Sequence, residues 1–450
     1  MTELFGTNGI RGEINERMTS QLALDLGKAM GTWIGKDSKV AIGTDTRVSN
    51  DMLKSAVSSG LMTTGCDVID LGELPTPAIQ HYTRKKADLG VVITASHNPP
   101  KFNGIKCIYS DGTELIEHME KEIEKIYFSK DFDLVDWKAV GKMKEDEAIT
   151  NYKESIKEKI DYEVIREAKP KVILDCANGA GCFVTPYLLK DLGCEVVTLN
   201  AQPDGTFPGH ESEPTEENLK DLIKITKESD ADLGIAHDGD ADRTICIDEN
   251  GDYIYGDRIL ALVAKELVQK NDGGIVVTPI ASSTCVRDVV EANGGELIYT
   301  KVGSPIVARK MKEKEALFGG EENGGLIFAE HQYCRDAAMT AAKVVELIAK
   351  KGKLSEMIDE LPTYHLVKKS FRCQDELKDQ VLDKLKILYR DENFDDTDGL
   401  KLYYDRGWVL IRPSGTEPKY RVYSESSDRE TAEKLAEKHL EQAIEVMDSI

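Results

Sequence analysis

The segment VVITASHNPPKFNG, Val91 to Gly104, joins an apolar run to a polar loop. An apolar run of this kind is typical of a buried strand, and the Asn-Pro-Pro that follows prevents the strand from continuing. The segment therefore predicts that Ser96 and His97 lie at the tip of a buried strand, on a loop stiffened by two prolines.

The same arrangement recurs three times along the chain, as an internal repeat. Each repeat starts with an apolar strand that ends in a polar loop, at KVAIGTDTR from Lys39, KVILDCANGAG from Lys171 and GGIVVTPIASS from Gly273. A helical stretch and a second strand follow, at GCDVIDLG, GCEVVTLN and GGELIYTKVG. A third strand then runs into a polar loop, at LGVVITASHNPP, LGIAHDGDADR and EALFGGEENGG. Strands that alternate with helices indicate largely parallel sheets, in which ligands bind at the carboxyl ends of the strands.

The last part of the chain has a different pattern. GLKLYY, GWVLIRPS and KYRVYSE are short strands, and YYDRGW is typical of a hairpin turn. Ser427 and Glu430 form a capping-box pattern that predicts the start of a final amphipathic helix. We therefore expect an α/β fold of three similar domains with mixed, largely parallel sheets, followed by a C-terminal α+β domain. The expected domains cover residues 1–150, 151–250, 251–362 and 363–450.

The composition argues against several classes of protein. The 450 residues carry a formal net charge of -23, and no segment concentrates the basic residues that a nucleic-acid surface needs. No apolar run reaches the length of a membrane span, and the N-terminal MTELFGTNGIRGE lacks the apolar core of a signal peptide. The nine cysteines include no C-x-x-C pair, and an odd number suits reduced thiols. We expect a cytoplasmic protein that binds neither nucleic acid nor membrane.

The segment DGDADR places three carboxylates, Asp238, Asp240 and Asp242, at alternate positions after a strand. Carboxylates this close repel one another, and a divalent cation such as Mg²⁺ resolves the repulsion. An EF-hand would need glycine at Arg243, and a haloacid-dehalogenase phosphatase would need threonine or valine at Asp242. A solvated acidic turn is the alternative to a cation site.

The segment RPSGTEP offers the donors of a phosphate-binding loop. Arg412 has a forked guanidinium, Ser414 and Thr416 have hydroxyls, and Gly415 lets backbone N–H groups approach an anion. An ordinary Pro-Ser-Gly turn would have the same sequence, so this segment alone leaves both interpretations open.

Two further glycine-rich loops carry polar side chains. In GEENGG, Glu321 and Asn323 suit neighbouring hydroxyl groups of a sugar, because a carboxylate accepts and an amide both donates and accepts. In FGTNGIRG, Arg11 lies on a loop that could equally be a structural turn.

A catalytic role for Ser96 follows from what the other loops offer. A hydrolase is disfavoured, because Ser96 and His97 are adjacent and the G-x-S-x-G turn is absent. No nucleotide-binding glycine motif occurs either. With a cation site and a phosphate-binding loop elsewhere, we expect phosphoryl transfer through Ser96 itself, because a phosphoserine dianion would be neutralised by the cation.

The segments TASHNPPKFNGIK, DGDADR, GEENGG and RPSGTEP, in this order, resemble the four signature loops of the α-D-phosphohexomutases, and the resemblance covers the whole chain. In that family the four domains surround one central cleft. The resemblance implies that Ser96 is phosphorylated and that it joins the three aspartates as a ligand of Mg²⁺. It further implies that Glu321 and Asn323 contact sugar hydroxyls, and that the phosphate not being transferred is held by Arg412, Ser414, Gly415 and Thr416. Other cleft residues implied in this way are Arg11, His97, Lys106, Arg243, Lys301 and Arg421, of which Lys106, or alternatively His97, is the candidate for proton transfer.

The sequence departs from the family pattern at two positions. Many relatives have serine at the position of Asn323 and histidine at that of Gly325, and both positions bear on the choice of sugar. The chain is most similar to archaeal-type phosphoglucosamine mutases, with phosphomannomutase/phosphoglucomutase close behind.

The resemblance implies reversible conversion of a hexosamine 6-phosphate to the 1-phosphate, as in the synthesis of UDP-N-acetylglucosamine precursors. A hexose 1,6-bisphosphate is the implied intermediate and activator. The implied partner is therefore a small sugar phosphate, and the protein could be a monomer or a homodimer. Two other hypotheses are a phosphatase with an aspartyl nucleophile in DGDADR and a sugar-phosphate-binding protein without activity.

Overall fold

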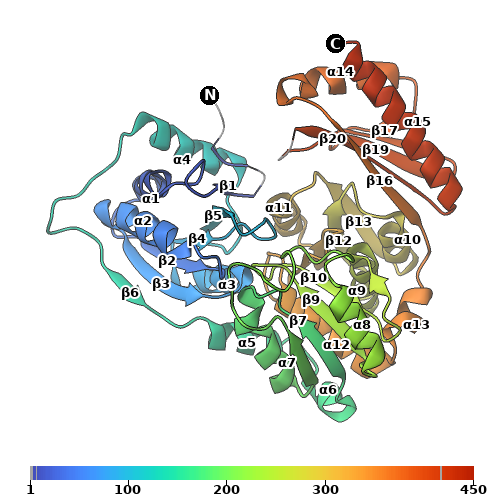
Figure 1. The fold of residues 1–450 in the computed structure, drawn as a ribbon, viewed down its shortest axis with the longest axis horizontal. Coiled ribbons are helices and arrows are strands. Elements are labelled where there is room, and N and C mark those ends of the chain that lie inside the picture. The colour runs from blue at the N-terminus through green and yellow to red at the C-terminus, as the bar shows by residue number, and fades with distance from the viewer. Residues whose placement is uncertain (1–3, 7, 416–417) are drawn as a thin grey trace. The chain divides into compact units, whose positions relative to one another are not determined.

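Strand β4 (Leu89–Ile93), which precedes the loop of Ser96, lies inside a six-stranded sheet of order β1-β5-β4-β2-β3-β6 (Figure 1). The computed structural model describes residues 4–6, 8–415 and 418–450. The chain divides into two units, one made of Met1–Ile259 with Asn323–Ile358, and the other of Leu260–Glu322 with Asp359–Ile450. Each unit has its own buried apolar clusters.

The first sheet belongs to the first unit. All five residues of β4 are buried, and its sequence LGVVI is accordingly apolar throughout rather than alternating, as expected for a central strand covered on both faces. The elements of this region are β1 (Ile10–Glu13), α1 (Ser20–Ile34), β2 (Lys39–Thr44), α2 (Asn50–Thr63), β3 (Asp67–Glu73), α3 (Thr76–Lys86), β4, β5 (Phe102–Tyr109), α4 (Glu117–Ser129) and β6 (Met143–Glu145).

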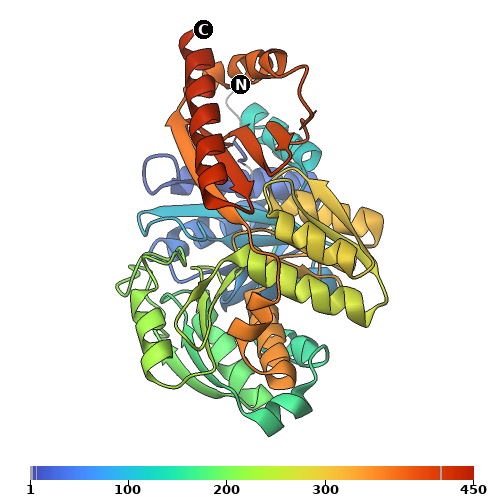
Figure 2. The same ribbon diagram turned by 90° about the vertical axis from the view of Figure 1, so that its right-hand side faces the viewer.

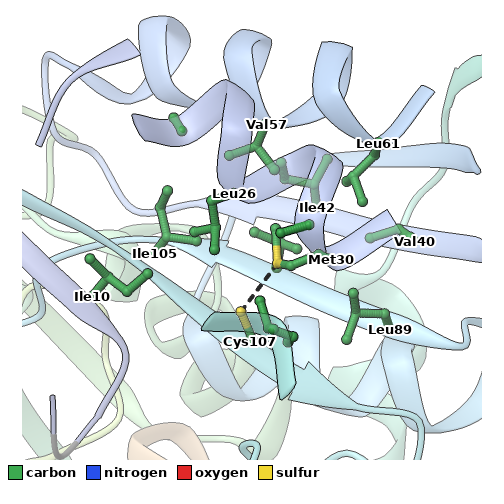
Figure 3. Close-up of a cluster of buried hydrophobic side chains, with 14 of the residues drawn as sticks. Ile10, Leu26, Met30, Val40, Ile42, Val57, Leu61, Leu89, Ile105 and Cys107 are labelled. Atoms are coloured by element: carbon green, nitrogen blue, oxygen red, sulfur yellow. Dashed lines mark hydrogen bonds between the residues drawn. The ribbon is translucent and has the colours of Figure 1, made fainter. Parts of the chain in front are cut away.

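The main apolar cluster of this region lies between the sheet and the helices α1 and α2. Leu26 and Met30 of α1 meet Val57 of α2 and the strand residues beneath them (Figure 3). The Sγ atom of Cys107 on β5 lies 3.3 Å from the Sδ atom of Met30. This cluster fixes one face of the sheet, so that the loops at the ends of its strands rest on a rigid support.

A second sheet of the first unit has the order β11-β10-β9-β7-β8. Strand β9 is apolar and fully buried, and the segment DGDADR follows it directly. The elements are α5 (Ile149–Lys157), α6 (Tyr162–Ala168), β7 (Lys171–Asp175), η1 (Ala180–Phe183), α7 (Thr185–Leu192), β8 (Glu195–Leu199), α8 (Lys220–Glu228), β9 (Leu233–His237), β10 (Thr244–Ile247) and β11 (Tyr253–Ile254). The first unit also contains β15 (Leu326–Phe328) and α12 (Ala337–Lys351).

The second unit begins within α9 (Gly256–Lys270), and α13 (Leu354–Asp359) spans the last of the three points at which the chain passes between units. Its first part contains the third repeat, in which β12 pairs in parallel with both β13 and β14. The elements are β12 (Gly274–Pro279), α10 (Thr284–Ala292), β13 (Gly295–Thr300), α11 (Ser304–Lys314) and β14 (Phe318–Gly320).

The three predicted repeats share one topology. In each, the first strand lies between the second and the third, giving the local orders β4-β2-β3, β9-β7-β8 and β14-β12-β13, with all these pairs parallel. The predicted α/β repeat is therefore confirmed. Because the first and third strands are neighbours, the polar loops that follow them lie at the same edge of each sheet.

The C-terminal region is an antiparallel sheet of order β16-β20-β19-β18-β17, and α15 lies along one of its faces (Figure 2). The predicted hairpin at YYDRGW joins β18 to β19. The predicted capping box is wrong by one residue, because Asp428, not Ser427, caps α15 by accepting a hydrogen bond from the N–H of Thr431 at 2.8 Å. The elements are β16 (His365–Arg372), η2 (Asp375–Leu377), α14 (Lys378–Leu388), β17 (Phe394–Asp395), β18 (Leu400–Tyr404), β19 (Gly407–Pro413), β20 (Lys419–Ser426) and α15 (Arg429–Asp448).

Three α/β repeats followed by an α+β region agree with the predicted fold class. Among the helices that the structure describes, none combines the length and the hydropathy that a membrane-spanning segment requires.

Candidate active site

Ser96 lies three residues beyond the end of β4 and is fully buried. Its backbone adopts a positive φ of 52°, a conformation that few residues other than glycine adopt. Its hydroxyl donates a hydrogen bond of 2.8 Å to Oδ2 of Asp238, which is 142 residues away in the sequence. The serine of the first repeat thus meets the first aspartate of the second repeat.

The two loops fit closely at Gly239. A Cβ atom added to Gly239 would lie 2.5 Å from the carbonyl oxygen of Ser96, closer than side-chain carbons approach such atoms. Only glycine therefore allows the DGDADR segment to pass directly against the backbone of Ser96.

The three aspartates form a buried cluster, as the sequence predicts. One carboxylate oxygen from each of Asp238, Asp240 and Asp242 lies within 4.8 Å of the others, so the cluster could hold a metal ion. Lys106, in the middle of β5, places its Nζ 2.7 Å from Oδ2 of Asp240 and 3.5 Å from Oδ2 of Asp242. Thr76 donates to the same oxygen of Asp240 at 2.6 Å.

The pKa values of Asp238 and Asp240 are shifted in opposite directions. Burial, reinforced by the charges of Asp242 and Asp240, raises the pKa of Asp238 well above its ordinary value. Burial would also raise the pKa of Asp240, but Lys106 outweighs it and lowers that pKa. Burial alone would lower the pKa of Lys106, but the negative charges of Asp240 and Asp242 outweigh this effect and raise it.

Two carboxylate oxygens of the cluster fit a divalent cation. Oδ1 of Asp240 and Oδ1 of Asp242 are buried, and neither has a hydrogen-bond partner among the described residues. Nε of Arg243 lies 3.8 Å from Oδ1 of Asp242, beyond hydrogen-bond distance. Buried carboxylate oxygens without hydrogen bonds are costly, and hard divalent cations are bound by such oxygens.

His97 lies beside Ser96, while Arg11 contacts the preceding residue and Arg243 lies 3.9 Å from Asp238. The Nδ1 atom of His97 lies 3.4 Å from Oγ of Ser96, and its Nε2 lies 3.4 Å from Glu213. Glu213 also pairs with Arg243, at 2.8 Å. Burial, together with the charges of Arg243 and Arg11, lowers the pKa of His97, so its imidazole is neutral near pH 7.

Arg11 is anchored to the serine loop itself. Its Nη1 donates to Oδ1 of Asn98 at 2.9 Å and to the carbonyl of Ala95 at 3.3 Å. The first unit therefore brings together all of its predicted catalytic, metal-ligating and cationic residues: Arg11, Ser96, His97, Lys106, Asp238, Asp240, Asp242 and Arg243. Asn323, also assigned to this unit, accepts a hydrogen bond from the N–H of Gly325.

The second unit groups the other predicted residues. Arg412 and Arg421 are opposite each other on the paired strands β19 and β20. Nε of Arg412 lies 2.9 Å from Asp398, whose carboxylate also accepts from the N–H of Val302 at 3.1 Å. This aspartate thus links the strand of Arg412 to the segment of Lys301.

The other predicted residues of the second unit lie on its loops. Glu321 is buried and accepts from the N–H of Gly303 at 3.2 Å, while Lys301 is exposed. The N–H of Ser414 donates to the carbonyl of Lys419, and Gly415 follows it. Thr416 lies outside the described residues.

Arg335 also belongs to this site, although no pattern in the sequence around it predicts this. This arginine is buried, and its Nη2 lies 2.5 Å from Oδ2 of Asp242. A Cβ atom added to Gly325 would lie 2.2 Å from Cδ of Arg335, so the side chain of Arg335 fills the space beside Gly325. The signal in the sequence was Gly325 itself, since a glycine where many relatives have histidine leaves room for another side chain.

We expect that Arg335→Ala lowers the free energy of unfolding by about 3 kcal/mol in the presence of a chelator, because it leaves Asp242 buried with a weaker partner. Gly325→Ala should act on the same contact by displacing Arg335. The double variant should therefore lose no more stability than Arg335→Ala alone. Urea denaturation followed by circular dichroism measures all three, and additive losses would mean that the two positions are independent.

Comparison with known proteins shows to which protein family the chain belongs. Four family models match it in order, each described as part of phosphoglucomutase/phosphomannomutase: alpha/beta/alpha domain I at residues 2–134, domain II at 150–251, domain III at 255–364, and the C-terminal domain at 370–442. The chain belongs to the phosphoglucomutase/phosphomannomutase family. The predicted resemblance to the phosphohexomutases is thereby confirmed.

Individual members of the family match over nearly the full chain. A phosphoglucomutase/phosphomannomutase of Thermococcus kodakarensis is 47% identical over 99% of this chain and 100% of its own length. A protein of Methanopyrus kandleri named "Probable phosphoglucosamine mutase" is 42% identical over 98% of each chain. The crystal structure of a phosphoglucomutase/phosphomannomutase family protein from Burkholderia thailandensis matches with a TM-score of 0.89 and 27% identity, over 100% of this chain and 98% of the other.

Proposed function

We propose that this member of the family interconverts a hexose or hexosamine 6-phosphate with the 1-phosphate through a phosphorylated Ser96. The observation that carries the proposal is the hydrogen bond from Ser96 to Asp238, inside a buried cluster with Asp240, Asp242 and Lys106. A hydroxyl buried beside carboxylates that could hold a cation is suited to becoming a phosphoserine, whose dianionic charge needs such neutralisation.

In the first half of the proposed reaction, the bond from Oγ of Ser96 to phosphorus breaks and a bond forms from phosphorus to the free hydroxyl of the sugar phosphate. The product is a hexose 1,6-bisphosphate. After the sugar turns over, its other phosphoryl group returns to Ser96. Positioning and charge neutralisation supply most of the catalysis, because phosphoryl transfer needs little covalent chemistry from the protein.

The residues of the first unit have distinct proposed tasks. The side chains of Asp238, Asp240 and Asp242, together with phospho-Ser96, would hold Mg²⁺, and the ion would neutralise charge on the phosphoryl oxygens. Lys106 is the proposed carrier of the hydroxyl proton, with His97 as the alternative. The remaining cations proposed to face the substrate are Arg11, Arg243 and, from the second unit, Lys301.

The second unit carries the proposed recognition of the sugar phosphate. Arg412 and Arg421, opposite each other on adjacent strands, form a pair of guanidinium groups suited to a phosphate dianion. We propose that they hold the phosphate that is not transferred, with Ser414, Gly415 and Thr416. Glu321 and Asn323 are proposed to bind hydroxyl groups of the sugar.

We propose glucosamine phosphate as the preferred substrate, which the resemblance to archaeal-type phosphoglucosamine mutases implies and the name of the Methanopyrus relative supports. The second candidate is a phosphomannomutase/phosphoglucomutase, which the 47% identical Thermococcus relative favours. Three further predictions stay proposals: the domain boundaries given above, a cytoplasmic location, and a monomeric or homodimeric state.

A coupled assay with the 1-phosphates of glucosamine, glucose and mannose tests the choice of sugar. We expect kcat/KM to be highest for glucosamine 1-phosphate, by about tenfold over mannose 1-phosphate, since a single substituent in a binding site is typically worth this much or more. A higher kcat/KM for mannose 1-phosphate would make the protein a phosphomannomutase and leave the proposals for Ser96 and the aspartates unchanged.

A further inference from the structure

We infer that Arg47 is a positioning residue for phosphoryl transfer, because its guanidinium holds the main chain of the Ser96 loop. The inference rests on the proposed role of Ser96. Arg47 follows β2, in the polar loop TDTR that ends the first strand of the first repeat. Its side chain is fully buried.

Every N–H group of the Arg47 guanidinium has an acceptor. An arginine side chain has five such donors in a planar fork, and here four of them point to carbonyl groups of the segment from Ser96 to Phe102, the first residue of β5. Nε donates to Asp45 at 3.1 Å, Nη1 donates to the carbonyls of Pro99 and Phe102 at 2.8 Å each, and Nη2 donates to the carbonyls of Ser96 at 2.8 Å and Asn98 at 2.5 Å.

The peptide groups on both sides of Ser96 are held, directly or through Thr94, by the ion pair of Asp45 and Arg47. Its carbonyl accepts from Arg47, and its N–H donates to Oγ1 of Thr94 at 2.8 Å. The hydroxyl of Thr94 in turn donates to Asp45 at 2.6 Å, and Asp45 is the ion-pair partner of Arg47. The positive φ of Ser96 is therefore imposed from both sides by the Asp45–Arg47 pair.

Arg11 also contacts this loop, at the side chain of Asn98 and the carbonyl of Ala95, but Arg47 binds more of its backbone carbonyls. Pro99 and Pro100 have no N–H groups, so the segment after Ser96 offers mainly carbonyl groups for hydrogen bonding. The carbonyls of Ser96, Asn98 and Pro99 precede β5, which begins at Phe102, and they accept hydrogen bonds from Arg47 instead of from a paired strand.

Arg47 is itself fixed. Its backbone N–H donates to Oδ1 of Asp45 at 2.9 Å, and Asn50 donates to the same oxygen at 3.0 Å. The ring of Phe207 lies 5.0 Å from the guanidinium carbon. A guanidinium held in this way sets the position of Oγ of Ser96 relative to Asp238, and a displacement of about 1 Å at a reacting atom can lower a rate about 100-fold.

The test uses the full-length protein with Arg47→Lys, which keeps the charge but cannot span four carbonyls. We expect kcat to fall about 100-fold, with KM for the sugar phosphate within about threefold of the parent value. Arg47→Ala should recover part of its kcat when guanidinium ion is added, and none with ammonium ion. Arg258→Lys is the matched control, because this arginine donates to the carbonyl of Ile358 at 2.7 Å, outside the loop of Ser96, and should keep the parent kcat.

A second measurement does not depend on the reaction. Hydrogen–deuterium exchange of peptides covering residues 93–98 should be at least about tenfold faster in Arg47→Lys than in the parent, since the hydrogen bonds that order this loop are lost. Thr94→Val, which removes only the bonds to Ser96 and Asp45, provides the same comparison if Arg47→Lys does not fold.

The possible results of these experiments distinguish a failure of the inference about Arg47 from a failure of the proposed function. Parent-like kcat and parent-like exchange in a folded Arg47→Lys would overturn the inference, as would a loss of kcat that guanidinium ion does not restore to Arg47→Ala. A parent that transfers no phosphoryl group would overturn the proposed function instead. The exchange comparison would then still decide whether Arg47 orders the loop.

Discussion

Replacing Ser96 with alanine should lower mutase activity by at least about 10⁴-fold, because every turnover passes through its hydroxyl in the proposed reaction. The free energy of unfolding should change by only about 1 kcal/mol, since the change removes one short hydrogen bond, to Asp238, and a longer contact with His97. The measurements are the coupled assay, urea denaturation, and incorporation of labelled phosphoryl from a hexose 1,6-bisphosphate into the intact protein.

Ser58→Ala is the matched control for this prediction. Ser58 is also a buried serine of the first unit, but it lies on α2 and belongs to no proposed site. This control should keep both activity and labelling. Labelling of Asp238 or another aspartate in the parent protein would contradict the prediction and support the phosphatase with an aspartyl nucleophile.

Asp240→Asn has the second large expected effect. The variant loses the charge that pairs with Lys106 at 2.7 Å, and an amide replaces the carboxylate whose Oδ1 has no hydrogen-bond partner among the described residues. The Mg²⁺ concentration for half-maximal activity should rise about 100-fold or more, because a charged oxygen ligand is lost from a cluster of three. Titration of activity with Mg²⁺ and calorimetry of Mg²⁺ binding both report this change.

Asp248→Asn controls for the loss of a buried carboxylate. Asp248 follows β10 and accepts hydrogen bonds from the N–H groups of Asn250 and Asp252, so it stabilises a turn. Its replacement should leave the Mg²⁺ requirement at the parent value. If Asp240→Asn also kept the parent requirement, the acidic segment would be a turn without a metal ion.

The buried strands of the fold could be predicted because the residues of each strand and of the loop after it are enough to indicate it. LGVVI is apolar throughout, LGIAH is apolar as far as His237, and polar residues follow each, and these patterns predict β4 and β9 because a strand buried on both faces is mostly apolar. The error at the last helix has a local cause as well. Asp428 stands next to Ser427, both are good capping residues, and the sequence pattern does not choose between them.

The contacts of the site were less predictable because they join distant parts of the chain. Lys106 and Asp240 are 134 residues apart, and only the resemblance to a family placed Lys106 near the substrate. Arg335 and Arg47 belong to no signature loop. The segment KVAIGTDTR showed a polar loop after a strand, yet nothing in its residues indicates that Arg47 binds the loop of Ser96, since its partners there are backbone carbonyls common to every sequence.

The contact at Gly239 constrains how such a protein can be recombined. Because Gly239 of the DGDADR segment lies against the carbonyl of Ser96, where a Cβ atom would not fit, the two backbones are complementary in shape at this point. Chimeras that join the first α/β repeat of one relative to the second repeat of another will therefore depend on a match of backbone paths. Sequence identity at the signature residues does not guarantee that match. The first two repeats should therefore be exchanged together, and crossover points that give an active chimera should lie after the second repeat.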